Sequence, residues 1–162
     1  MAGYGDDAGF AAWMAENGYV LPGDAPSPAI LRNRGSQYID AVYGYRFVGR
    51  VADYDQERAW PRTGAIVNGV VVPSDAVPKA VIFASYFAAL EEANNPGSLQ
   101  VTGSSASMVK REKVGPLEVE YQSVASDGTA AGITPLISIV DGMLAPFLCD
   151  DTLMGLGIWS VG

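Results

Sequence analysis

Histidine is absent from the 162-residue chain, and cysteine occurs once, as Cys149. Without histidine the chain lacks the commonest general base, the Ser-His-Asp arrangement and imidazole metal ligands. One cysteine forms neither an intrachain disulfide nor a cysteine-rich zinc site. A phosphate-binding loop of the GxxxxGKS/T type is also missing. We therefore predict a protein that is not an enzyme and has no catalytic residues, no cofactor and no metal.

Two acidic groupings could suggest otherwise. Asp53, Asp55 and Glu57 alternate as in a calcium loop, but the required glycine and the closing bidentate glutamate are not in place. Asp150-Asp151 is more typical of a solvated turn than of a catalytic acid pair. Neither grouping changes the prediction.

Basic residues are scarce. Lys and Arg number 10 against 18 Asp and Glu, which gives a formal net charge of −8. Proteins whose main task is nucleic-acid binding neutralise phosphates with Lys and Arg. The excess of acidic residues therefore argues against DNA binding as the main role. It suits a surface that DNA passes without binding.

Long hydrophobic runs are absent too, and none approaches the roughly 20 residues of a membrane-spanning helix. Met1 to Phe10 carries acids where a signal peptide needs bases. Hydrophobic residues nevertheless make up 49% of the chain, with a mean hydropathy of +0.15. This apolar content is enough for the core of one domain. The apolar residues beyond that core favour contacts between subunits, and we expect no association with a membrane.

Four segments have the apolar spacing of helices. They run from Asp6 or Asp7 to Asn17 with Gly18 as a C-terminal cap, over 28–47 with Ser27 as a cap and Gly49 closing the element, over 78–93, and over 134–147 with Thr134-Pro135 as its start. Leu31, Gly35, Tyr38, Val42 and Tyr45 form the stripe of the second helix, where Gly35 would allow a close helix crossing. Pro146 is expected to kink or end the last helix.

Two hairpins are predicted. Asn68-Gly69 between valines is a strong turn signal. Between 109 and 121 the apolar period changes to two, and a turn at Gly115-Pro116 would pair Lys113 with Glu118 and Arg111 with Glu120. Pairing of Lys110 with Glu118 would contradict this register.

The predicted fold class is mainly α: a small helical bundle of about four helices with a projecting β-hairpin and an extended C-terminal arm. The bundle spans 1–148 with the hairpin inserted around 108–124 between Ser/Gly-rich stretches, and the arm spans 149–162. The arm is apolar, with Leu156, Ile158 and Trp159. It is expected to dock on its own domain or on a neighbour.

Arginines and aromatic residues concentrate in the second helix and the loop after it. Such interleaving can bind single-stranded DNA by stacking and phosphate contact. The alternative, which we favour, is an internal network in which Arg58 or Arg62 pairs with Asp40, Asp53 or Asp55, with Trp60 anchoring the loop at Pro61. The residues concerned are Arg32, Arg34, Arg46, Arg50, Arg58 and Arg62, with Tyr38, Tyr43, Tyr45 and Trp60 among them.

One set of motifs resembles a known family. They are Tyr38-Ile39-Asp40, Phe47-Val48-Gly49-Arg50, Gln56 with Ala59-Trp60-Pro61-Arg62-Thr63-Gly64, Val77-Pro78, Lys113-Val114-Gly115-Pro116 with Glu118 to Tyr121, and Leu144-Ala145-Pro146. Their order and spacing resemble a tailed-phage family whose members are labelled DnaT-like single-stranded-DNA-binding proteins. Trp-Pro-Arg with the upstream Gln is the most specific part.

Proteins of this kind also resemble phage head–tail connectors, which form a ring, expected to be dodecameric, on the portal protein. The resemblance implies a virion protein of the neck, assembled in the host cytoplasm, whose partners are its own copies, the portal, a downstream neck or tail-completion protein, and genomic DNA that passes without specific binding. Trp60, Pro61 and Arg62 would be a structural anchor. The expected subunit or portal interface comprises Lys113, Gly115, Pro116, Leu117, Leu156, Ile158 and Trp159.

Two other roles stay open. One is a DnaT-like single-stranded-DNA-binding accessory protein of replication. The other is a different virion role, such as head completion or tail termination.

Overall fold

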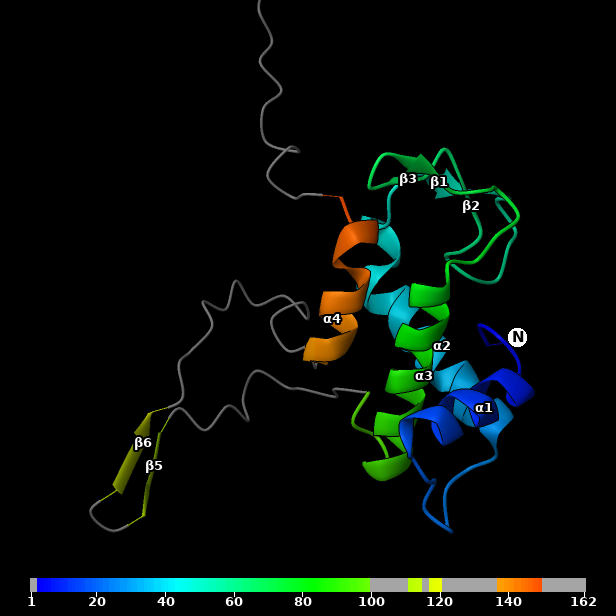
Figure 1. Ribbon diagram of the computed structural model, residues 1–162. Helices are drawn as coiled ribbons and strands as arrows, with labels where there is room; N and C mark the ends of the chain where they lie inside the picture. Colours follow the sequence, from blue (N-terminus) through cyan, green and yellow to red (C-terminus); the bar gives the residue numbers. More distant parts are fainter. Residues whose placement is uncertain (1–2, 100–110, 115–116, 121–136, 150–162) are drawn as a thin grey trace, which may run out of the picture.

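The computed structural model describes residues 3–99, 111–114, 117–120 and 137–149, with the backbone alone for the two four-residue strands. Four α-helices dominate it, and short two-stranded antiparallel sheets complete it (Figure 1). The predicted mainly α class with a β-hairpin is confirmed. The C-terminal arm lies outside the described residues, apart from Cys149.

Helix α1 spans Asp7–Asn17 and has the predicted ends. The carboxylate of Asp6 accepts a hydrogen bond from the Gly9 amide at 2.7 Å, which satisfies a free donor of the first turn. Gly18 adopts a left-handed conformation with φ 70° and closes the helix. Phe10 and Trp13 are buried on one face and join α1 to α3 through Tyr86.

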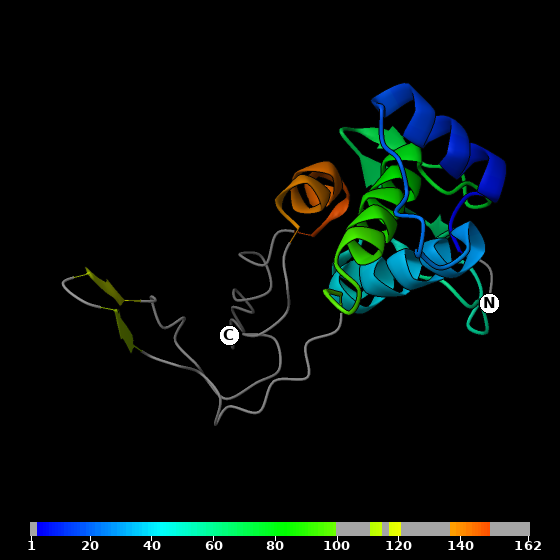
Figure 2. The same cartoon turned by 90° about the horizontal axis from the view of Figure 1, so that it is seen from below.

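Helices α2 (Pro28–Tyr43) and α3 (Lys79–Asn94) form the centre of the bundle, and both Figure 1 and Figure 2 show them packed against each other. Gly35 of α2 lies against the backbone of α3: a Cβ added there would be 2.3 Å from the Ser85 carbonyl oxygen. The predicted close crossing at Gly35 is confirmed. The small residues of α3, such as Ala84, Ala88 and Ala89, are fully buried at this contact.

The second helix is shorter than predicted. It ends at Tyr43 and continues as a 3-10 turn, η1, over Gly44–Arg46. The tighter turn changes the spacing, so Tyr45 leaves the buried stripe and is 79% exposed. Ser27 precedes the helix, but its side chain makes no capping hydrogen bond. Gly49 does not close the helix either; it has φ 76° and lies against Thr63 and Ala65.

Helix α4 spans Ser138–Leu144 and packs on α3. The predicted start, Thr134-Pro135, lies outside the described residues; the helix itself begins only at Ser138, because Ile137 has extended backbone angles. The helix ends at Leu144, and a 3-10 turn, η4, runs over Ala145–Phe147, so the predicted end at Pro146 is confirmed. Val140 and Leu144 are buried, whereas Ile139 is exposed and does not belong to the buried stripe.

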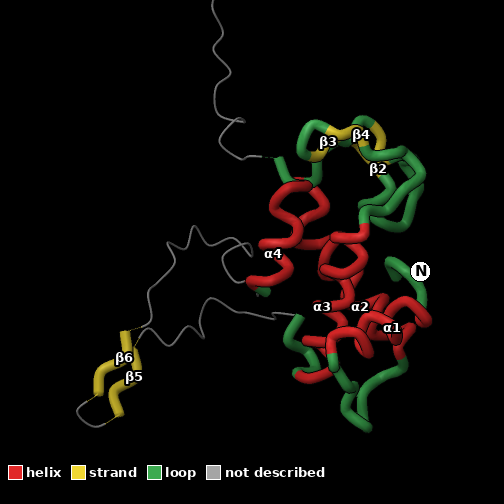
Figure 3. Tube along the Cα trace, viewed as in Figure 1, coloured by secondary structure: helices red, strands yellow, loops and turns green. Residues whose placement is uncertain are grey.

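The loop between α2 and α3 carries two short hairpins, seen together at one end of the molecule in Figure 3. Strand β1 (Arg50–Val51) pairs with β2 (Arg62–Thr63), and β3 (Ile66–Val67) pairs with β4 (Val70–Val71). Asn68 and Gly69 have φ of 50° and 79°. A type I′ turn requires a positive φ at both of its central residues. The predicted turn is therefore confirmed.

The third hairpin consists of β5 (Arg111–Val114) and β6 (Leu117–Glu120). Lys113 lies opposite Glu118, and Arg111 lies opposite Glu120. This is the predicted register. Gly115 and Pro116, the predicted turn, lie outside the described residues.

Candidate functional site

Arg32 of α2 is nearly buried and holds the start of the chain. Its Nε and Nη2 both lie 2.8 Å from a carboxylate oxygen of Asp7. Its Nη1 donates to the carbonyl oxygens of Gly5 at 2.9 Å and Tyr4 at 3.2 Å, with Gly3 at 3.4 Å. This guanidinium group is therefore committed to the fold and is not presented to an external phosphate.

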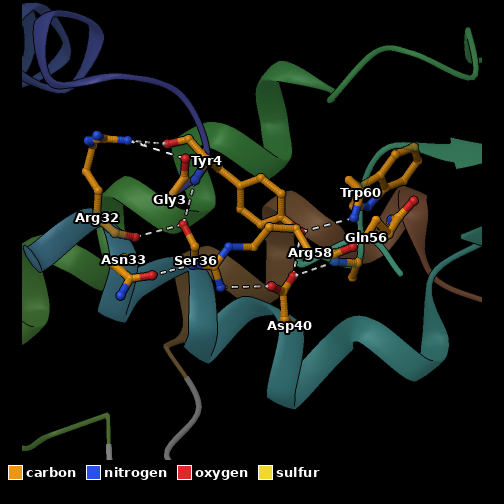
Figure 4. A network of polar contacts seen from close by, with 10 residues as sticks. Gly3, Tyr4, Arg32, Asn33, Ser36, Asp40, Gln56, Arg58 and Trp60 are labelled. Atoms are coloured by element: carbon orange, nitrogen blue, oxygen red, sulfur yellow. Dashed lines mark hydrogen bonds and ion pairs between the residues drawn. The ribbon is translucent and has the colours of Figure 1, made fainter. Parts of the chain in front are cut away.

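Asp40 is the centre of a second polar network, shown in Figure 4. Its carboxylate accepts hydrogen bonds from the Tyr4 hydroxyl, from Arg58 Nη1 at 3.2 Å and from the Ala59 amide at 3.2 Å. Arg58 also donates to the side-chain oxygen of Asn33. The network joins the start of the chain, α2 and the loop before β2. The predicted pairing of Arg58 with Asp40 is confirmed.

Tyr4 is the residue that the sequence did not reveal. Its hydroxyl donates to Asp40 and accepts a hydrogen bond from the Trp60 amide at 3.1 Å, while its own amide donates to Ser36 Oγ at 2.8 Å. A buried tyrosine with such contacts brings residues 4, 36, 40 and 60 together. Its position two residues before the Asp6 cap was the only sequence signal.

Trp60 is 1% exposed and packs edge-on against Phe47 and Phe147, with ring centroids 5.7 and 6.2 Å away. The bond to Pro61 is cis. Gln56 holds the same loop, because its Nε2 donates to the carbonyl oxygens of Arg58 at 2.6 Å and Pro61 at 3.0 Å. This explains in physical terms why a Gln accompanies the Trp-Pro-Arg motif.

Arg62 is buried, and its partners are backbone carbonyls. It donates to Val48 at 2.8 Å, Gly49 at 2.9 Å, Phe47 at 3.1 Å and Ala59 at 3.2 Å. Burial lowers the pKa of this guanidinium group. The carboxylate of Asp53, one of the predicted partners of this arginine, accepts a hydrogen bond from the Asp55 amide at 2.9 Å. The expectation of a carboxylate partner is thus met by Arg58 and not by Arg62.

Burial raises the pKa of four tyrosines, Tyr4, Tyr38, Tyr43 and Tyr86. The folded protein therefore holds these protons more tightly than the unfolded chain does. Their contribution to stability is fully present below the ordinary tyrosine pKa of about 10 and is lost as the pH rises toward the folded pKa.

We expect the free energy of unfolding to fall increasingly steeply as the pH rises above about 10. Urea titrations at several pH values would measure this. Tyr43→Phe should flatten the dependence, and Tyr54→Phe, at a side chain that is 96% exposed, is the control. A slope unchanged by Tyr43→Phe would contradict the assignment.

Tyr38 and Tyr43 of this region are buried and Arg46 is half-buried, whereas other side chains of the region face outward. Tyr45, Tyr54 and Arg50 are exposed, and the exposed acids Asp53 and Asp55 flank Tyr54. In the part of the chain that the structure describes, no group of three or more acidic or cysteine side chains could hold a metal ion.

A cleft of about 170 Å³ lies beside the Arg34–Glu92 ion pair, which is 3.0 Å long. It is lined by Arg34, Gln37, Tyr38, Ala41, Glu92 and Leu99.

Within the described ranges, no helix is long and apolar enough to cross a membrane.

The residues predicted for a subunit or portal interface are only partly placed. Lys113 and Leu117 lie on the backbone of β5 and β6, on either side of the predicted turn. Leu156, Ile158 and Trp159, like Gly115 and Pro116, lie outside the described residues. Trp60, Pro61 and Arg62 lie together at the loop between β1 and β3.

One family model matches the chain, over residues 3–158. No curated protein and no solved structure matches it at a significant level. The matched range covers nearly the whole sequence, including α1 to α4 and all three hairpins. The chain therefore belongs to the family described as "Putative DnaT-like ssDNA binding protein".

Proposed function

We propose that this protein is a structural component of a phage particle, a head–tail connector whose copies form a ring between the portal and the downstream neck. The observation that carries the proposal is the internal use of its arginines. Arg32, Arg58 and Arg62 bind groups of their own chain, so the cationic, aromatic region of the sequence serves the fold. The rest of the surface belongs to a chain of net charge −8, which DNA would pass with little adhesion.

Binding of single-stranded DNA is the second candidate, and the description of the family supports it directly. Among the described residues, Tyr45 and Tyr54 offer exposed rings for stacking, and Arg50 offers an exposed cation for phosphate. Asp53 and Asp55 beside Tyr54 oppose this role, because they repel phosphates.

One experiment separates the two candidates. Fluorescence anisotropy with a labelled single-stranded oligonucleotide, measured over a salt series, gives affinity and salt slope. The connector proposal predicts negligible binding at physiological salt and ring particles by negative-stain microscopy when the chain is mixed with its portal. Tight, salt-sensitive binding that Tyr54→Ala and Arg50→Ala weaken would favour the DNA-binding role. Absence of the chain from purified virions would overturn the connector.

The apolar tail gives a further prediction. Deleting Thr152–Gly162 should leave a folded monomer, because the described core is closed by residues up to Leu148, but it should abolish ring assembly on the portal. Circular dichroism and negative-stain microscopy measure the two results. Intact rings from the shortened chain would show that the tail is not an assembly contact.

A further inference from the structure

The β3–β4 hairpin exposes two large apolar side chains on one face, Ile66 and Val71, which we call the hairpin patch. They are 56% and 67% exposed. Ile66 and Val71 lie directly opposite each other across the two strands and so share one face. Valine and isoleucine exposed together on a short sheet are a typical docking surface for another apolar segment.

The described chain ends close to this hairpin. The Val48 amide donates to the Phe147 carbonyl at 2.9 Å, Phe47 and Leu148 form an isolated β-bridge, and the Cys149 amide donates to the Arg46 carbonyl at 2.7 Å. The described chain therefore ends at Cys149, beside Arg46.

Gly49, three residues along from Arg46, touches the base of the hairpin. A Cβ added to Gly49 would be 2.7 Å from the Thr63 carbonyl oxygen and 2.8 Å from the Ala65 amide nitrogen, so the two backbones are in contact. Ala65 directly precedes β3, and its carbonyl accepts a hydrogen bond from the Val72 amide at 2.9 Å, which closes the hairpin. Figure 1 shows the end of α4 and strand β3 at the same end of the molecule.

The segment that leaves at this point has matching chemistry. Beyond Asp150 and Asp151 it carries no charged side chain. Its apolar residues are Leu153, Met154, Leu156, Ile158, Trp159 and Val161. At about 3.3 Å per residue, the segment 150–162 can span roughly 40 Å, which is ample to return over the hairpin. A tethered segment acts at an effective concentration of about 1 mM, well above that of a second copy in dilute solution.

We propose that residues 153–161 dock on the hairpin patch of their own chain in the free subunit. The docked tail covers Ile66 and Val71 and shields its own Trp159. This inference concerns the isolated chain and does not rest on the connector role, because ring formation is measured separately.

Trp159 reports the docking. Trp13 and Trp60 are buried, at 5% and 1% exposure, so the difference in acrylamide quenching between the full chain and its Trp159→Phe variant isolates Trp159. We expect Trp159 in the full chain to be protected several-fold relative to the Ile66→Lys/Val71→Lys variant. Val20→Lys, at a side chain 83% exposed between α1 and α2, is the matched control and should leave the protection unchanged. Far-UV circular dichroism verifies that each variant is folded.

Protection must also survive about a hundredfold dilution of the protein, because an intrachain contact is independent of concentration. Three results would overturn the inference. Trp159 could be as accessible in the full chain as in the double-lysine variant. Its protection could persist in that variant, which would place the tail elsewhere. Protection seen only at high protein concentration would assign the patch to a second copy.

Discussion

Replacing Asp40 with alanine is expected to lower the free energy of unfolding by about 3 kcal/mol. The change removes the acceptor for the Tyr4 hydroxyl, the Arg58 guanidinium and the Ala59 amide at once. The Arg58 side chain is 9% exposed, so it would keep a charge in a largely dry site without its carboxylate. The Asp40 side chain is 19% exposed and therefore partly hydrated. The expected loss of stability thus lies at the lower end of the range that follows when one partner of a buried ion pair is removed.

Denaturant titration monitored by circular dichroism measures this loss. Asp53→Ala is the matched control, because this exposed acid accepts a hydrogen bond only from a neighbouring amide in the same loop, and it should change stability by less than about 0.5 kcal/mol. A double-mutant cycle of Asp40→Asn with Arg58→Met isolates the pair from the other contacts. Additive effects of these two substitutions would contradict the assigned coupling.

The same network shows how far sequence reasoning extends. The sequence narrowed the internal ion pair to Arg58 or Arg62 with Asp40, Asp53 or Asp55, and the structure selects Arg58 with Asp40. The partners of Arg32 could not be found in this way. They are mainly backbone carbonyls of residues 3–5, brought to α2 by the folding of the N-terminal segment, and carbonyl acceptors leave no mark in the sequence.

Local signals predicted the helices and turns well because their causes are local. The acidic start of α1, the left-handed Gly18 and the Asn68-Gly69 turn each depend on a few neighbouring residues. Tyr45 was placed wrongly because a switch from α to 3-10 geometry after Tyr43 shifts every later side chain. The start of α4 was misplaced because a Thr-Pro pair fits a helix start but does not determine one, and Ile137 is extended.

Gly35→Ala is expected to destabilise the protein by about 3 kcal/mol, although alanine is the better helix former. The added methyl group would lie 2.3 Å from the Ser85 carbonyl oxygen and 2.8 Å from the Ala89 amide nitrogen. Both atoms belong to the backbone of α3, which cannot rotate away as a side chain could. The two central helices must therefore separate, which loosens the packing of Ala84, Ala88 and Ala89.

Gly142→Ala in α4 makes the comparison decisive, because it is the same chemical change in a helix where no heavy atom lies within 4 Å of the added Cβ. It should stabilise the protein by about 0.5–1 kcal/mol through helix propensity alone. Opposite signs for the two variants, measured by urea or thermal unfolding, would assign the loss at residue 35 to the helix crossing. If both variants gain stability, α2 and α3 do not approach as closely as described here. Helix α3 contacts both α1 and α4, so a defect at its crossing with α2 should weaken the whole bundle. The unfolding transition should therefore remain a single cooperative step.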